Sequence, residues 1–119
     1  MFAKTRTTLR KYLTCFWRYM ANNYFRNVAA FFKTSELIDK PVSIRRTNLK
    51  NGLDGICEKV NDRFFIRVNK DLPENYSIDV LIHEVAHAVA WEKDNDIHGL
   101  NWGKAYSKVY RMFLEKFIE

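Results

Sequence analysis

The sequence predicts a single α+β domain, because segments with helical periodicity lie on both sides of a central stretch with strand-like alternation. The chain has 119 residues, the usual size of one domain with one hydrophobic core. Hydrophobic residues make up 47% of the chain and charged residues 29%, a balance that excludes the disordered and low-complexity classes. We therefore expect one domain over residues 1–119, with a helical segment at 1–33 and the sheet and remaining helices at 34–119.

The N-terminal segment, residues 1–33, is predicted to form one amphipathic helix or two helices with an aromatic face and a basic back. Its apolar residues recur at steps of three and four, and it holds seven basic residues and no acidic one. The aromatic face suits packing into the core. The basic back suits contact with water or contact with a polyanion such as nucleic acid, and a membrane-surface helix or an organellar targeting peptide is the remaining alternative. The candidate nucleic-acid-binding residues in this segment and the region that follows are Arg10, Arg18, Arg26, Arg45 and Arg46.

The middle of the chain is predicted to form a small antiparallel sheet of about three strands. Apolar and polar residues alternate over 41–47, 56–60 and 63–68, as they do in strands with one buried face. The pair Asn61 and Asp62 separates the last two runs and is a candidate hairpin turn.

Two helices are predicted to complete the domain. The first is capped by Asn75 or Ser77 and runs to about Glu92, and it is the most apolar helix of the chain. The second is capped by Asn101 and carries an apolar stripe at helical spacing, which we expect to face the core. The stripe consists of Trp102, Ala105, Val109, Phe113 and Phe117.

The first of these helices contains the HExxH motif, with histidines at positions 83 and 87. Two histidines four residues apart lie about one turn from each other on the same side of a helix, so both imidazoles can reach one metal ion. Glu84 is set back from that ion, where its carboxylate can take a proton from a metal-bound water. The alternative is a solvated pair of histidines, but the apolar helix around them indicates burial, and buried polar groups need partners.

A third protein ligand is expected, because a catalytic zinc ion usually has three and keeps one coordination position for water. His98 is the remaining histidine of the chain and the favoured third ligand. The competing third ligands are Glu92, Asp94, Asp96 and Glu115. We therefore expect one Zn²⁺ ion held by His83, His87 and His98.

These residues give the chain a resemblance to the SprT-like zinc metalloprotease family, the Spartan/SprT family. The family pattern is HExxH, then a histidine-glycine pair, then an aromatic residue three positions after the glycine. Here His98, Gly99 and Trp102 follow the motif in that order. The resemblance is strongest over residues 79–106 and compatible in element order over about 34–119.

The resemblance implies a site and a substrate class. It assigns zinc ligation to His83, His87 and His98, on a zincin-type helix, and the role of general base to Glu84. It also implies a minimal SprT-like domain without the C-terminal zinc module of larger members. Substrates in this family are proteins bound to DNA or crosslinked to it.

The function expected from the motif and the resemblance together is a zinc-dependent endopeptidase, a hydrolase that acts on protein or peptide substrates and on DNA-associated or DNA-crosslinked proteins in particular. The alternative is a zinc-containing nucleic-acid-binding module with little or no protease activity, and a purely structural metal site is a third interpretation. Asp79 is a candidate for orienting a ligand histidine. The candidates for stabilising the oxyanion of the transition state are Tyr76, Tyr106 and Tyr110.

The remaining sequence features concern compartment and partners. Cys15 and Cys57 are 42 positions apart and form no CxxC motif, which favours two free thiols in a reducing compartment. No run of 18 apolar residues and no signal peptide is present. We therefore expect a monomer in the cytoplasm with no membrane partner, and the compact length favours a bacterial or viral source.

Overall fold

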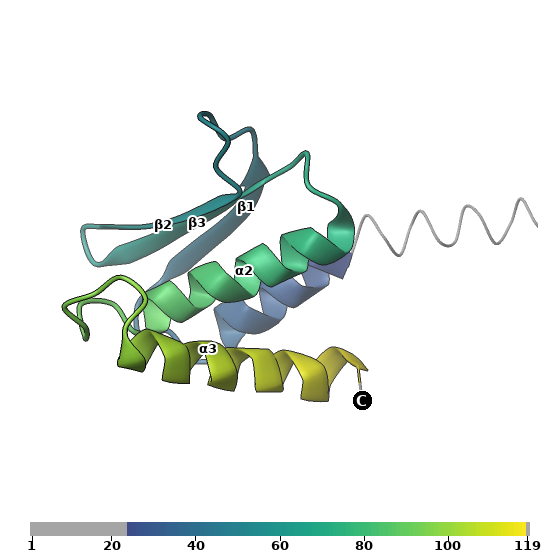
Figure 1. The fold of residues 1–119 in the computed structure, drawn as a ribbon. Helices are drawn as coiled ribbons and strands as arrows, with labels where there is room; N and C mark the ends of the chain where they lie inside the picture. The colour runs from purple at the N-terminus through teal and green to yellow at the C-terminus, as the bar shows by residue number, and fades with distance from the viewer. Residues whose placement is uncertain (1–23, 119) are drawn as a thin grey trace, which may run out of the picture.

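The computed structural model describes residues 24–118 and confirms the α+β class (Figure 1). Residues 24–34 form a helix, and a three-stranded sheet and two further helices follow it. The elements are β1 (Val42–Thr47), β2 (Gly55–Val60), β3 (Arg63–Asn69), α2 (Glu74–Val89), α3 (Leu100–Phe113) and a π-helical turn, η1 (Leu114–Ile118). Arg10 and Arg18 lie outside the described residues, as do residues 1–23 of the predicted N-terminal helical segment.

The sheet is mixed, so the expectation of an antiparallel sheet is wrong for one of its two strand pairs. The strand order is β1-β3-β2, and β2 pairs antiparallel with β3 whereas β1 pairs parallel with it. Successive strands reverse direction along the chain, but only the order β1-β2-β3 would make every pair of neighbours antiparallel. Instead β3 is central, the position that suits its three buried apolar residues. These are Phe64, Ile66 and Val68, all on the face toward the helices.

The expected hairpin turn at Asn61 and Asp62 joins β2 to β3. Both residues have positive φ angles, 50° and 60°, as a type I′ turn requires. Asparagine and aspartate tolerate this left-handed conformation better than most other residues, so the turn forms without glycine. The turn fixes the register of the two strands, in which Gly55 lies opposite Val68.

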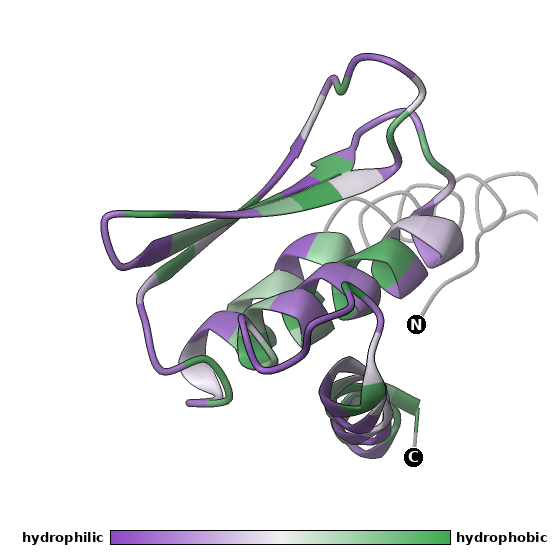
Figure 2. Cartoon of the chain, turned by 60° about the vertical axis from the view of Figure 1, so that its left-hand side comes forward, coloured by the Kyte–Doolittle hydropathy of each residue, from purple (hydrophilic) through white to green (hydrophobic). Residues whose placement is uncertain are grey.

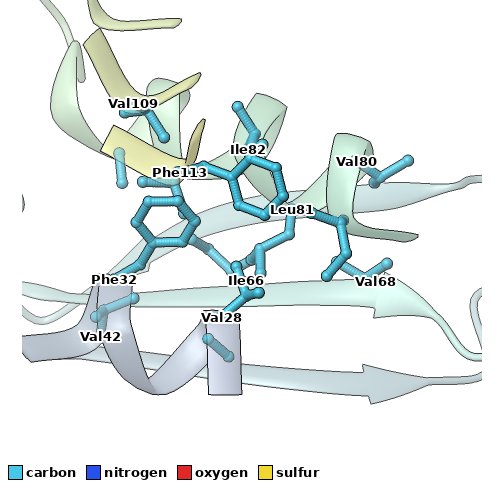
Figure 3. Packing of buried hydrophobic residues seen from close by; sticks show 14 of the residues in the cluster. Val28, Phe32, Val42, Ile66, Val68, Val80, Leu81, Ile82, Val109 and Phe113 are labelled. Carbon is cyan, nitrogen blue, oxygen red and sulfur yellow. The ribbon is translucent and has the colours of Figure 1, made fainter. Parts of the chain in front are cut away.

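The helices cover one face of the sheet, and α2 lies between the sheet and α3 (Figure 1). This central position explains why α2 is apolar on nearly all sides. The core forms where the sheet, α2, α3 and the helix at 24–34 meet (Figure 3). Its members with the least exposure include Val28, Phe32, Ile66, Val68, Leu81, Ile82 and Val109.

The outer helix, α3, buries only a narrow stripe. Figure 2 views α3 end-on, and much of its surface is hydrophilic. The predicted stripe is confirmed at Ala105, Val109 and Phe113, which are buried. Within residues 24–118, none of the helices combines the length and the apolar character that a membrane span requires.

The starts of both helices differ from the sequence prediction. Helix α2 begins directly after Pro73, so Ser77 lies inside its first turns, where its hydroxyl donates to the carbonyl of Glu74. Proline suits this position because its φ angle is fixed and it has no N–H group to satisfy. Helix α3 begins after Gly99, and Asn101 lies inside it. The cap of α3 comes from a residue farther back in the chain, as described below.

Candidate metal centre

Three imidazoles converge at one point beside α2. His83 and His87 lie on successive turns of α2, and His98 reaches them from the loop that precedes α3. The Nε2 atom of His83 lies 3.1 Å from that of His87 and 3.2 Å from that of His98. In the described part of the chain, these three histidines are the only group of His, Cys, Asp and Glu side chains placed to share a metal ion.

The geometry of this cluster fits a tetrahedral metal ion. Nitrogen ligands at the usual zinc distance of about 2.0–2.1 Å lie about 3.3–3.4 Å from each other in a tetrahedral site. The two separations at His83 are close to that value. A ring nitrogen carries at most one proton, so Nε2 of His83 can donate a hydrogen bond to only one of its two neighbours. A divalent cation would instead accept a lone pair from each imidazole, and three imidazoles are a usual donor set for zinc.

The pKa values of two histidines favour the neutral form that binds metals. Burial lowers the pKa of His83, and a charge on His98 would lower it further. Burial lowers the pKa of His87 to about 4, with contributions from His83 and His98. Both rings therefore offer free lone pairs at neutral pH, as metal ligation requires.

Glu84 is a buried acidic residue beside the histidine cluster. Only 6% of its surface is exposed, and its Oε2 atom has no hydrogen-bond partner among residues 24–118. Burial raises the pKa of Glu84 to about 7. Strand β2 passes so close that a Cβ atom on Gly55 would lie 2.5 Å from Val80 and 3.2 Å from Glu84. A buried carboxyl without a partner is unfavourable for stability, and such groups concentrate at functional sites.

The loop that carries His98 is anchored by Asp94. The Asp94 carboxylate accepts hydrogen bonds from the backbone N–H groups of Asn101 and Trp102, at 3.1 and 2.9 Å, and from the Asn101 side-chain amide at 2.8 Å. It thereby caps α3 from outside the helix. Gly99 packs against this carboxylate, since a Cβ atom there would lie 2.7 Å from the Asp94 Cγ atom. A glycine follows His98 because any larger residue at position 99 would clash with the Asp94 side chain.

Trp102 forms a wall of the centre. Its ring lies 4.9, 5.5 and 4.7 Å, centre to centre, from the rings of His83, His87 and His98. It thus contacts all three imidazoles and restricts their rotation. His98 is exposed, so the centre remains open to solvent on its side.

Two cavities adjoin the centre. The larger, of about 660 Å³, contains all three histidines and Trp102 in its wall together with Cys57 of β2. Burial, with help from Glu84 and Glu58, raises the pKa of Cys57 to about 12, so its thiol stays protonated at neutral pH. The smaller cavity, of about 350 Å³, lies beside His83 and Glu84.

Among residues 24–118, the arginines predicted to bind nucleic acid lie away from the histidines. Arg26, Arg45 and Arg46 line one groove of about 490 Å³ between the helix at 24–34 and β1, together with Lys33. Arg46 is occupied there, because it pairs with Glu74 at 3.1 Å and donates to the carbonyl oxygens of residues 70 and 72. The other three have no carboxylate within ion-pair distance in the described part of the chain. Since β1 and β2 are opposite edges of the sheet, this groove and the histidines are separate sites.

Sequence reasoning missed two functional contributions. The sequence identifies Asp94 only as a competing ligand, whereas its carboxylate anchors the loop of His98. The role of Trp102 as a wall of all three imidazoles also needed coordinates, although its place after the histidine-glycine pair was a signal. Of the three candidate tyrosines, Tyr106 lines the smaller cavity, and so does Tyr76, whose hydroxyl donates to Asp54. The remaining competing ligands, Glu92, Asp96 and Glu115, do not join the histidine cluster.

The fold and site together define an α+β protein with a candidate three-histidine metal centre on its central helix. No protein-family model matches the chain, and no curated protein matches it.

Proposed function

We propose that this protein is a zinc-dependent endopeptidase that hydrolyses peptide bonds with a metal-activated water. The observation that carries the proposal is the buried carboxyl of Glu84, which has no partner among the described residues and lies next to three converging imidazoles. A purely structural site has no need of such a carboxyl, whereas a hydrolytic site needs a base beside the metal.

The roles of the residues follow from their positions. His83, His87 and His98 would hold the zinc ion, which when bound acts as a Lewis acid and lowers the pKa of a coordinated water to about 7. Glu84 takes a proton from the attacking water and delivers it to the leaving amine. Burial raises the pKa of Glu84 to about 7, and a carboxylate made more basic in this way is a better proton acceptor. Trp102 keeps the imidazoles in place, and the exposed side at His98 admits the substrate.

The test is cleavage of casein by the zinc-loaded full chain. We expect Glu84→Gln to lower kcat/KM by about 10²–10⁴-fold, the usual contribution of a general base, while the bound zinc stays the same. Glu115→Gln, the same chemical change at an exposed position on η1, is the matched control and should cleave like the parent. Hydrolysis that survives in Glu84→Gln, or that persists after complete chelation, would rule the proposal out.

A second candidate function, nucleic-acid binding, is favoured by the groove at β1. Arg26, Lys33 and Arg45 present three cations there without carboxylate partners among the described residues. Such a groove suits a phosphate backbone, and a protein bound to DNA would then be brought to the histidine centre as substrate.

Salt dependence of DNA binding tests this second function. Removing two phosphate contacts with Arg26→Gln and Arg45→Gln should make the slope of log K against log salt less steep by about 2. Arg111→Gln, at an exposed site on α3, is the control and should leave the slope unchanged. An unchanged slope in the double variant would remove the groove from consideration.

A further inference from the structure

The smaller cavity beside the histidine centre has a negative lining. Its walls include Asp54, which directly precedes β2, and Asp79, which lies one helical turn before His83. Tyr76 and Tyr106 complete two of its sides, and none of its described lining residues is a lysine or arginine. The cavity therefore presents two carboxylates and two aromatic rings without a balancing cation.

The two carboxylates are not accounted for by internal partners. Asp79 makes no ion pair or hydrogen bond through its carboxylate with any described residue. Asp54 accepts one hydrogen bond, from the hydroxyl of Tyr76 at 2.6 Å, and its other carboxylate oxygen has no partner within residues 24–118. The negative charge of the two carboxylates affects both tyrosines. The hydrogen bond to Asp54 and the charge of Asp54 raise the pKa of Tyr76. Burial, followed by the charge of Asp79, raises the pKa of Tyr106.

An independent feature marks this cavity as a place for a ligand. Glu84, which is 6% exposed and whose Oε2 atom has no partner among residues 24–118, is part of the same wall. A metal ion is not the ligand that fits, because Asp54, Asp79 and Glu84 do not form a group close enough to share one. An organic cation fits better, since it can reach separated carboxylates by hydrogen bonds and rest against aromatic faces.

We propose that this cavity is a specificity subsite that takes a cationic group of a polypeptide substrate, the ammonium or guanidinium of a Lys or Arg side chain or a free terminal amine. Asp79 and Asp54 receive the charge, and Tyr76 and Tyr106 contact the apolar stem. The subsite rests on the proposed peptidase function, because its value lies in placing a neighbouring peptide bond beside Glu84 and the histidines.

The experiment measures binding and cleavage of the same peptides. Short fluorescent peptides that differ in one residue, Lys, Arg, Gln or Glu, are prepared with acetylated and with free N-termini. Binding is measured on the zinc-loaded full chain carrying Glu84→Gln, and cleavage on the zinc-loaded parent chain. We expect peptides with Lys or Arg to bind about tenfold more tightly than their Gln counterparts.

Variants of Asp79 and Asp54 test whether these two carboxylates cause the preference for cationic peptides. Asp79→Asn and Asp54→Asn should each reduce the Lys-to-Gln affinity ratio, and Asp79→Lys should reverse it in favour of Glu. Asp62→Asn is the matched control, because Asp62 is an exposed carboxylate in the β2–β3 turn and asparagine suits its positive φ angle. The control should keep the full ratio. Tighter binding of every peptide with a free N-terminus than of its acetylated counterpart, whatever the varied residue, would identify the terminal amine as the cation.

The outcomes separate this inference from the function on which it rests. Affinity that depends neither on the varied residue nor on acetylation of the N-terminus, or a cation preference that persists in both Asp79→Asn and Asp54→Asn, would overturn the subsite even if every peptide is cleaved. A cation preference that depends on Asp79, in a protein whose parent form cleaves none of the peptides, would support the subsite and contradict the peptidase.

Discussion

Glu84 has an environment that works against its own ionisation. It lies in the middle of α2, beneath β2, and its carboxyl is buried without a full set of partners in the described residues. Its pKa of about 7 is the direct result of that burial. The same property that suits Glu84 for proton transfer therefore lowers the stability of the protein at neutral pH.

The first prediction concerns the stability that the protein loses when the buried Glu84 carboxyl ionises. A carboxyl whose pKa is raised from 4.5 to about 7 on folding contributes stability that is present at low pH and is lost as pH rises through 7. With metal chelated, we expect Glu84→Gln to gain stability relative to the parent between about pH 5 and about pH 8, by up to about 3 kcal/mol. Urea unfolding followed by circular dichroism measures the difference. Glu115→Gln should show no such trend, and a flat difference for Glu84→Gln would contradict the buried carboxyl.

At the scale of residues, the sequence predicted the cluster of three histidines better than the residues that support it. The cluster of His83, His87 and His98 was foreseeable, because spacing on a helix and the scarcity of histidine restrict the choice. The anchor at Asp94 was not, since its carboxylate acts on residues seven and eight positions ahead. Such a contact depends on the path of the loop, which no local spacing rule describes.

The loop between α2 and α3 is the element that brings the third imidazole to the other two. It leaves α2 through Glu92, whose φ angle is positive at 59°, and it is closed by the hydrogen bonds of Asp94. Hydrogen bonds from Trp102 and Asn101 lower the pKa of Asp94 against an opposing effect of desolvation, so the anchor stays ionised.

A pair of glycine variants tests the loop. In Gly99→Ala, the new methyl group would meet Asp94, displace its carboxylate from α3 and loosen His98, so we expect zinc affinity to fall about 10–100-fold. Gly103→Ala is the matched control, because a Cβ atom there contacts nothing within 4 Å and alanine favours a helix. Competition with a zinc chelator measures both affinities. Equal affinity in the two variants would show that Asp94 and Gly99 do not position His98.

The alternation of apolar and polar residues predicts where the strands lie but not the order in which they pair. Alternation located all three strands, and the Asn61-Asp62 turn fixed the pairing of β2 with β3. The position of β1 was not predictable in this way. The connection between β1 and β2 is not a tight turn, so which strand pairs with β1 depends on how the whole sheet buries its apolar residues. The high apolar content of β3 was the available signal for its central place.

For the whole molecule, the core and the candidate metal centre are largely distinct. Apart from Ser77, the largest fully buried side chains among residues 24–118 are aliphatic and aromatic, and none is a histidine. A zinc finger that lacks such a core unfolds when its metal is removed. This chain has a core of its own and should not depend on metal to fold.

The third prediction follows from that distinction. We expect the chelated protein to keep its helical circular dichroism signal and a cooperative thermal transition. Zinc at about 100 times its Kd should then add about 2.7 kcal/mol of stability and raise Tm by about 10 °C or more. His98→Ala should remove most of this shift. Unfolding of the parent protein by chelator alone would favour a structural metal site instead.

The central place of β3 leaves the two outer strands with different neighbours, cations along β1 and histidines beneath β2. A polyanion bound along β1 would leave the histidine centre beneath β2 accessible, so a polyanion and a ligand of the histidine centre can bind at the same time. Separation-of-function variants should therefore be obtainable. Removing the cations along β1 should abolish polyanion binding and leave the histidine centre beneath β2 intact.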